Sequence, residues 1–132
     1  MIVLDTNSLI WWVGASNRLS KKAGSAIEKA REEKALYISS ISVWEIYTLV
    51  KKRKLELDTL LDNWLENIEE LSFVHFVPLD NKIAVQSVML PDFSNSDPAD
   101  RIIIATAQIM GATLITSDKR ILKYKHVQTL KS

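Results

Sequence analysis

Four acidic residues stand where apolar runs of the sequence end or where helical patterns begin. Asp5 directly follows the run Ile2-Val3-Leu4, and Asp118 follows the last strong apolar run. Glu45 and Asp100 come early in two helical patterns. If the runs are parallel strands, their ends and the first turns of the following helices lie at one edge of the sheet. Four carboxylates gathered there need cations, and the chemistry that suits such a site best is metal-assisted attack on a phosphodiester.

The type of metal follows from the donor atoms that the chain offers. It has no cysteine and only two isolated histidines, His75 and His126, so carboxylate oxygens are the available ligands. Oxygen donors favour Mg²⁺, with Mn²⁺ as a possible substitute, over Zn²⁺.

Each acid also has an ordinary explanation as a helix cap. One of Asp5, Thr6 and Asn7 could cap a short helix that holds Leu9 to Val13, and Asp118 could cap a helix from Lys119 to Tyr124. The segment Ser42-Val43-Trp44-Glu45 fits a capping box, and for Glu45 alone capping is the better explanation. Capping does not explain why all four acids fall at the same edge of the predicted sheet, so the joint pattern favours the metal site.

The segment Asp97-Pro98-Ala99-Asp100 combines a cap with a candidate ligand. Asp97 is the predicted N-cap, Pro98 occupies the favoured first helical position, and Asp100 comes two residues later. The helix that follows is almost entirely apolar before Gly111 ends it, so the charge of Asp100 should be partly buried. A buried carboxylate needs a cation or several donors to remain ionised.

Short apolar runs alternate with helical patterns along the chain. The expected strands are residues 2–4, 36–38, 73–79 and 113–116, and residues 127–130 would add a final short strand. The expected helices include residues 21–34, a helix that begins at Ser42, an apolar stripe with an acidic back from Leu57 to Leu71, and residues 98–110. Alternating strands and helices predict an α/β fold, a three-layer α/β/α arrangement around a mainly parallel sheet of four or five strands.

Length and composition limit the remaining possibilities. With 132 residues, 47% of them hydrophobic, the chain fits a single domain that spans residues 1–132. The net charge of +1 leaves nucleic-acid contacts to local basic patches. No apolar stretch approaches the ~20 residues that cross a bilayer, and no leader precedes the first strand, so we expect a cytoplasmic protein without membrane contact.

These residues together resemble PIN-domain ribonucleases, most closely the small VapC-like toxins of type II toxin–antitoxin modules. The most specific block is Asp97 to Ala107, and the other blocks are residues 2–7, 40–46 and 114–118. The resemblance implies an Mg²⁺-dependent endoribonuclease that cleaves RNA with a metal-activated water. It also implies a cognate antitoxin as partner and a homodimer. The alternative is a non-catalytic PIN module that binds RNA or a protein partner.

The resemblance also implies roles for individual residues. The acidic quartet of the family falls on Asp5, Glu45, Asp100 and Asp118. Glu45 would act directly on the metal or through a bound water, while the other three would hold it. Asp97 matches a further acid that is either a ligand or simply the helix cap, with the cap slightly favoured. Supporting polar positions fall on Asn7 and Thr116.

Basic and aromatic residues complete the sequence-based prediction. The candidates for RNA binding follow Asp118 directly and are Lys119, Arg120, Lys123 and Lys125. Trp11 and Trp12 cannot both point inward on one helix, so one of them is expected at an interface with a second copy or an antitoxin. Core packing is the default expectation for Trp44.

Overall fold

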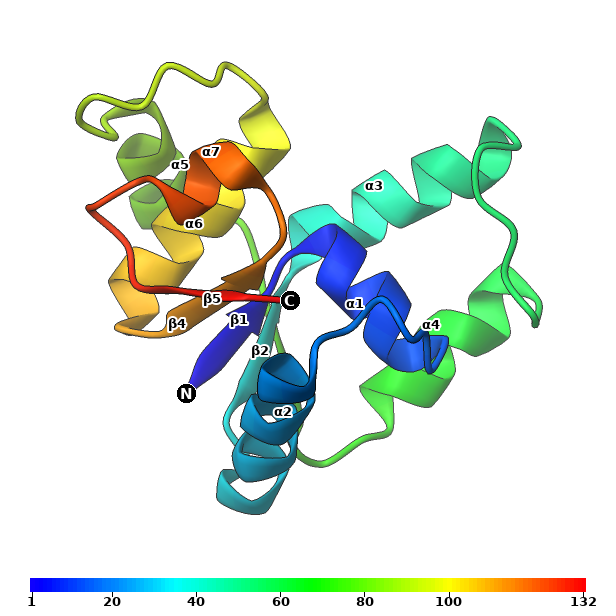
Figure 1. Cartoon of the computed structure of the whole chain (residues 1–132). Coiled ribbons are helices and arrows are strands. Elements are labelled where there is room, and N and C mark those ends of the chain that lie inside the picture. Colours follow the sequence, from blue (N-terminus) through cyan, green and yellow to red (C-terminus); the bar gives the residue numbers. More distant parts are fainter.

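The computed structural model describes residues 1–132 and contains one sheet of five parallel strands (Figure 1). The strands are β1 (Ile2–Leu4), β2 (Leu36–Ser39), β3 (Val74–Val77), β4 (Thr113–Thr116) and β5 (Thr129–Lys131). Their spatial order is β3-β2-β1-β4-β5, so the first strand of the chain lies at the centre. Leu4 pairs with Ile38 on one side and with Ile115 on the other, which places the carboxyl ends of β1, β2 and β4 side by side.

Helices cover both faces of this sheet (Figure 1). They are α1 (Thr6–Val13), α2 (Lys21–Glu33), α3 (Ser40–Lys51), α4 (Leu61–Glu69), α5 (Asn81–Val88), α6 (Pro98–Met110) and α7 (Lys119–Leu122). Helices α1, α2 and α4 pack on one face, α6 and α7 pack on the other, and α5 lies against α6. None of the helices is both long enough and apolar enough to cross a bilayer. The predicted three-layer α/β/α fold with a parallel sheet is confirmed.

The central strand shows why this architecture follows from the sequence. Ile2 and Leu4 point into the core beneath α1, α2 and α4, whereas Val3 points into the core beneath α6 and α7. Successive side chains of a strand alternate between the two faces, so a run of three apolar residues requires cover on both sides.

Several elements differ from the sequence-based prediction. Helix α4 begins at Leu61 instead of Leu57, and Leu60 just before it is 76% exposed. Strand β5 begins at Thr129 instead of residue 127. Helix α5 lies where no helix was predicted, because only Ile83 and Ser87 of its residues are buried and so narrow an apolar stripe gives a weak periodic signal.

The tryptophans divide between the core and the surface. Trp12 packs edge-on against Phe73 in the core, and the face of Trp11 meets the guanidinium of Arg18. The expectation of core packing for Trp44 is wrong, because its side chain is 64% exposed. Trp44 lies on the outer side of α3, where it lines a shallow groove between α3 and α4.

Candidate active site

A polar cavity opens at the edge of the sheet where β1 and β4 end. Its volume is about 330 Å³, and none of its nine lining residues is hydrophobic. The lining residues are Asp5, Thr6, Asn7, Glu45, Asp97, Asp100, Ser117, Asp118 and Arg120. The structure therefore brings together all four acids of the predicted quartet, together with Asp97 and Asn7.

The acid at the end of β1 has two structural tasks. The backbone N–H of Asp5 donates to Ile115 O in β4 at 3.1 Å, which extends the pairing of the two strands by one residue. Its Oδ1 accepts the backbone N–H of Ser8 at 2.8 Å and so caps α1. Of the three residues expected to supply this cap, Asp5 does so, and α1 begins earlier than expected, at Thr6. The cap uses one carboxylate oxygen, so the carboxylate keeps lone pairs that can bind a cation in the cavity.

Glu45 does not belong to a capping box, and that prediction is wrong. Strand β2 leads straight into α3, whose N-cap is Ser39, and the side chain of Ser39 accepts the backbone N–H of Ile41. Glu45 therefore sits in the second turn of α3. Its carboxylate accepts the hydroxyl hydrogen of Thr6, and Thr6 Oγ1 also lies 2.9 Å from Ser42 Oγ. Glu45 is thus held over the end of β1.

Asp97 and Asp100 open α6 as the sequence predicted. Asp97 Oδ1 accepts the backbone N–H of Ala99 at 3.1 Å, with Pro98 next to the cap, and Gly111 ends the helix with a φ of 64°. Asp100 Oδ2 accepts the side-chain amide of Asn95 at 2.8 Å. Asp97 and Asp100 thus both line the cavity. The carboxylate of Asp100 is also hydrogen-bonded to the neutral amide of Asn95.

Asp118 caps α7, as predicted, and its carboxylate is held by Arg120, which also lines the cavity. Its Oδ1 accepts the backbone N–H of Arg120 at 2.8 Å, and its Oδ2 accepts the guanidinium of Arg120 at 3.3 Å. The same guanidinium lies 4.0 Å from Asp100 Oδ2, so one cation stands between two acids. Thr116 is fully buried beneath the cavity, where its hydroxyl accepts the backbone N–H of Asp118 at 3.0 Å.

The pKa values of the acids reflect burial more than mutual repulsion. Burial raises the pKa of Asp5, against hydrogen bonds from Ser8 and Thr116. Burial also raises the pKa of Glu45 and of Asp100, and neighbouring acids add smaller upward contributions. For Asp118 burial acts in the same direction, but hydrogen bonds and positive charge from Arg120 together outweigh it, so its pKa is lowered. Three of the four acids would therefore ionise more readily beside a bound cation.

The donor set fits a hard divalent cation. Every candidate ligand is an oxygen, and no cysteine or histidine lines the cavity. No three of these side chains converge into a finished coordination shell, so the carboxylates stand around an open space instead of a closed cage. Mg²⁺ usually keeps several of its waters and binds proteins through one or two carboxylates, which an open cavity of this kind accommodates.

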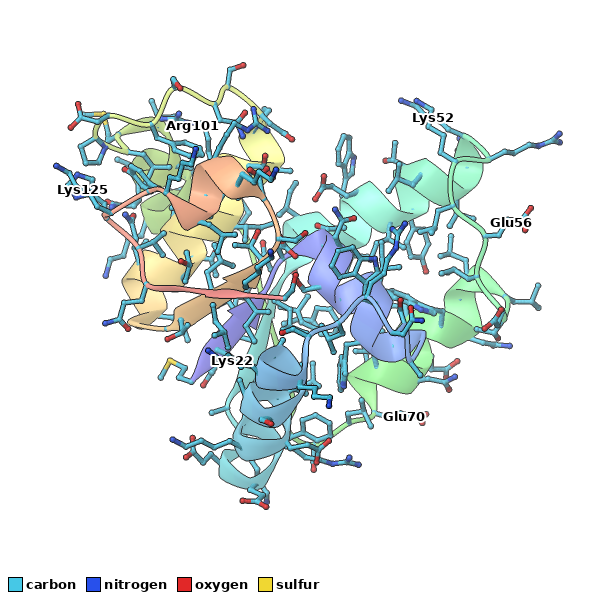
Figure 2. All side chains as sticks on the ribbon, viewed as in Figure 1. Lys22, Lys52, Glu56, Glu70, Arg101 and Lys125 are labelled. Carbon is cyan, nitrogen blue, oxygen red and sulfur yellow. The ribbon has the colours of Figure 1, made fainter.

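The predicted basic residues separate in the structure. Arg120 lines the cavity, whereas Lys119, Lys123 and Lys125 are exposed and do not line it. Figure 2 places Lys125 on the turn between α7 and β5, at the edge of the molecule away from α3.

Three polar residues near the cavity were missed by the sequence analysis. Thr6 donates to Glu45, Ser42 is hydrogen-bonded to Thr6, and Asn95 donates to Asp100. Thr6 stands directly after Asp5, and Ser42 lies three residues before Glu45 and therefore on the same side of α3, so spacing alone could have drawn attention to both. Asn95 lies in an irregular segment, and no periodic pattern marks it.

Comparisons with known proteins agree with this architecture. The model of the PIN domain family matches residues 2–127. Ribonuclease VapC22 of Mycobacterium tuberculosis is 34% identical over 125 residues, which covers 95% of this chain and 92% of the relative. The chain belongs to the PIN-domain family, as a ribonuclease of the VapC type, the class of toxins found in toxin–antitoxin pairs. Ribonucleases of this family are typically metal-dependent.

Solved structures support the same fold. The crystal structure of VapBC2 from Rickettsia felis bound to a promoter DNA fragment matches with a TM-score of 0.74 and 19% identity, over 100% of this chain and 99% of the other. A toxin–antitoxin complex from Klebsiella pneumoniae matches with a TM-score of 0.65 and 24% identity, over the whole of both chains. The resemblance inferred from the sequence blocks is confirmed.

Proposed function

We propose that this VapC-type ribonuclease is an Mg²⁺-dependent endoribonuclease in which Mn²⁺ can replace Mg²⁺, and that Asp5, Glu45, Asp100 and Asp118 form its catalytic site. The observation that carries the proposal is the polar cavity where all four acids meet, three of them with raised pKa values. Acids that are costly to ionise inside an empty cavity are well suited to hold a cation there.

The proposed roles follow the positions of the side chains. Asp5, Asp100 and Asp118 hold the cation, whereas Asp97 serves as the N-cap of α6. When bound, Mg²⁺ supplies an activated water and charge stabilisation for in-line attack on phosphorus, which leaves a 5′-phosphate and a 3′-hydroxyl. Supporting contacts come from Thr116, which hydrogen-bonds both Asp5 and the backbone of Asp118, and from Asn7 in the cavity wall.

Glu45 has the most specialised position of the four. The Thr6 hydroxyl fixes one of its oxygens, so the other is free to contact the cation or to hold a water beside the phosphorus. Burial raises the pKa of Glu45 in the metal-free protein, and a cation beside it would favour its ionised form.

The direct test is cleavage of a generic single-stranded RNA by the purified protein. We expect fragments to appear with Mg²⁺, to disappear with EDTA and to return when Mg²⁺ is added in excess, as read by gel electrophoresis with end-group analysis. Binding of the RNA without any cleavage in Mg²⁺ or Mn²⁺ would contradict the proposal and favour the non-catalytic PIN module.

The RNA path is proposed to run past α7, where Lys119, Arg120, Lys123 and Lys125 provide positive charge. Replacing Lys119 and Arg120 together by glutamine should weaken RNA binding and reduce the slope of log K against log salt by about 0.7 for each phosphate that the protein no longer neutralises. Fluorescence anisotropy at several salt concentrations measures this slope. The matched control replaces Lys51 and Lys52 by glutamine, at the end of α3 that lies away from the cavity. An unchanged salt slope in the variant of Lys119 and Arg120 would show that the RNA does not run past α7.

The proposed partners follow from the same class of protein. The solved relatives include a toxin–antitoxin complex, so we infer that this chain also has a cognate antitoxin. We further propose a homodimer in the cytoplasm, without contact to a membrane, built as a single domain over residues 1–132. A short neighbouring gene that encodes a DNA-binding segment and an amphipathic tail would identify the antitoxin.

A further inference from the structure

The irregular segment of residues 89–97, which joins α5 to α6, is fastened at several carbonyls by Arg101, while Tyr124 donates its hydroxyl to Pro91 O at 2.6 Å. The guanidinium of Arg101 donates to four backbone carbonyl oxygens. The acceptors are Ser87 O at 2.8 Å, Val88 O at 3.1 Å, Phe93 O at 2.9 Å and Asn95 O at 2.9 Å. Figure 2 shows Arg101 beside this segment. Arg101 thus ties the end of α5 and the segment to the first turn of α6.

The positive charge of Arg101 complements the carbonyl oxygens at the end of α5. Helix α5 has no basic residue in its last turn, so the guanidinium of Arg101 supplies the positive charge that the exposed carbonyls of a helix end favour. The planar group also stacks near the ring of Phe93, 5.7 Å from its centroid. A lysine has one compact ammonium and could not reach all four carbonyls in this arrangement.

Asn95 connects the segment held by Arg101 to an acid of the cavity. Asn95 as a whole residue is only 8% exposed, its backbone carbonyl accepts from Arg101, and its Oδ1 accepts the backbone N–H of Asp97 at 3.0 Å. The Nδ2 group therefore points in one direction, toward Asp100 Oδ2 at 2.8 Å. Both ends of the amide are used, so its orientation is determined by its partners.

We propose that Asn95 is a positioning residue for metal binding, which holds Asp100 Oδ2 so that Oδ1 faces the cation, and that Arg101 acts through Asn95. The inference rests on the proposed function, because it assigns Asp100 as a metal ligand. Partners of this kind orient the carboxylates that bind a metal, and their loss typically costs about 10–100-fold in metal affinity or activity.

The test measures Mn²⁺ binding without any substrate. We expect Asn95→Ala to raise the dissociation constant for Mn²⁺ by about 10–100-fold in calorimetry. Cleavage of RNA should recover toward the wild-type rate when Mn²⁺ is raised to saturation. Ser94→Ala is the matched control, because Ser94 is the adjacent residue, is exposed and should leave the Mn²⁺ affinity unchanged.

A second variant tests the connection to Arg101. We expect Arg101→Met also to weaken Mn²⁺ binding, and Asn95→Ala in that background to add much less than it does alone, because both changes remove the same restraint on Asp100. If Asn95→Ala lowers only the melting temperature and leaves Mn²⁺ affinity unchanged, Asn95 is a structural residue and the inference is wrong. Wild-type protein that neither binds Mn²⁺ nor cleaves RNA would instead overturn the proposed function itself.

Discussion

Replacing Asp100 by asparagine should reduce Mg²⁺-dependent RNA cleavage by more than about 100-fold, beyond the range expected for an outer partner of a ligand. The substitution keeps the size of the side chain, and its oxygen can still accept the amide of Asn95. The remaining position, which faces the cavity, then carries an NH₂ group in place of an anionic oxygen. An amide hydrogen directed at a cation repels it, so binding and cleavage should both fail. Initial rates over a range of Mg²⁺ concentrations measure the loss.

The matched control is Asp97→Asn, which changes another acid in the wall of the same cavity. Asparagine caps a helix as well as aspartate does, so the hydrogen bond to Ala99 should survive and most of the activity should remain. Near-normal cleavage by the Asp100 variant would remove Asp100 from the proposed site. A complete loss in the Asp97 variant would make Asp97 a ligand instead of a cap.

The first part of α6 could be predicted in detail because its capping residues and its apolar pattern indicate the same helix. An aspartate cap, a proline in the first turn and a glycine at the end define the limits of the helix from nearby residues alone. The rest of the helix is apolar and largely buried, so the carboxylate of Asp100 can lie only at the start of α6, at the edge of the sheet. The fold was predictable for the same reason, since short buried runs separated by helices permit few arrangements.

The start of α3 could not be predicted because its geometry depends on a distant contact. Ser42 and Glu45 have the spacing of a capping box, yet Ser42 is fully buried beside Thr6, 36 residues earlier in the chain. The helix accordingly starts directly after β2, with Ser39 as its cap. The hydrogen-bonded partner of Glu45, Thr6, lies on α1, so no local rule could identify it.

Asn95 and Arg120 illustrate two further limits of sequence reasoning. The position of Asn95 depends on Arg101 reaching back across the end of α5, a helix whose pattern was itself too weak to predict. Arg120 was expected only to contact RNA, but its guanidinium also hydrogen-bonds Asp118 and approaches Asp100. A residue two positions after an acid can reach back to it only in certain turns, and the short helix α7 provides such a turn.

Burial, more than repulsion between neighbouring acids, raises the pKa values at this site. It is the largest contribution for Asp5, Glu45 and Asp100. The difference matters for interpretation, because a penalty from burial persists when one neighbouring acid is removed. Only neutralisation of the buried acid itself, or a cation beside it, relieves that penalty.

The metal-free protein should therefore lose stability as the pH rises from about 4 toward neutrality. The folded-state pKa values of Asp5, Glu45 and Asp100 lie above their unfolded values, so the folded chain binds more protons than the unfolded chain in this range. The free energy of unfolding then falls with rising pH until the raised pKa values are passed. Asp118 acts in the opposite direction, but its lowered pKa places its contribution below about pH 4. Thermal melts in EDTA across this pH range measure the slope.

Mg²⁺ should reverse this loss near neutral pH. A ligand that binds only the folded state adds about 2.7 kcal/mol at a hundredfold excess over its dissociation constant, which corresponds to a rise of roughly 10 °C in Tm for a chain of this size. Asp100→Asn should make the metal-free protein more stable at neutral pH and weaken its response to Mg²⁺, because the variant no longer carries that buried charge. Melts of both proteins with EDTA or Mg²⁺ decide the matter. If the substitution destabilises the metal-free protein and leaves the full Mg²⁺ response, Asp100 serves only the start of α6 and the cation binds elsewhere.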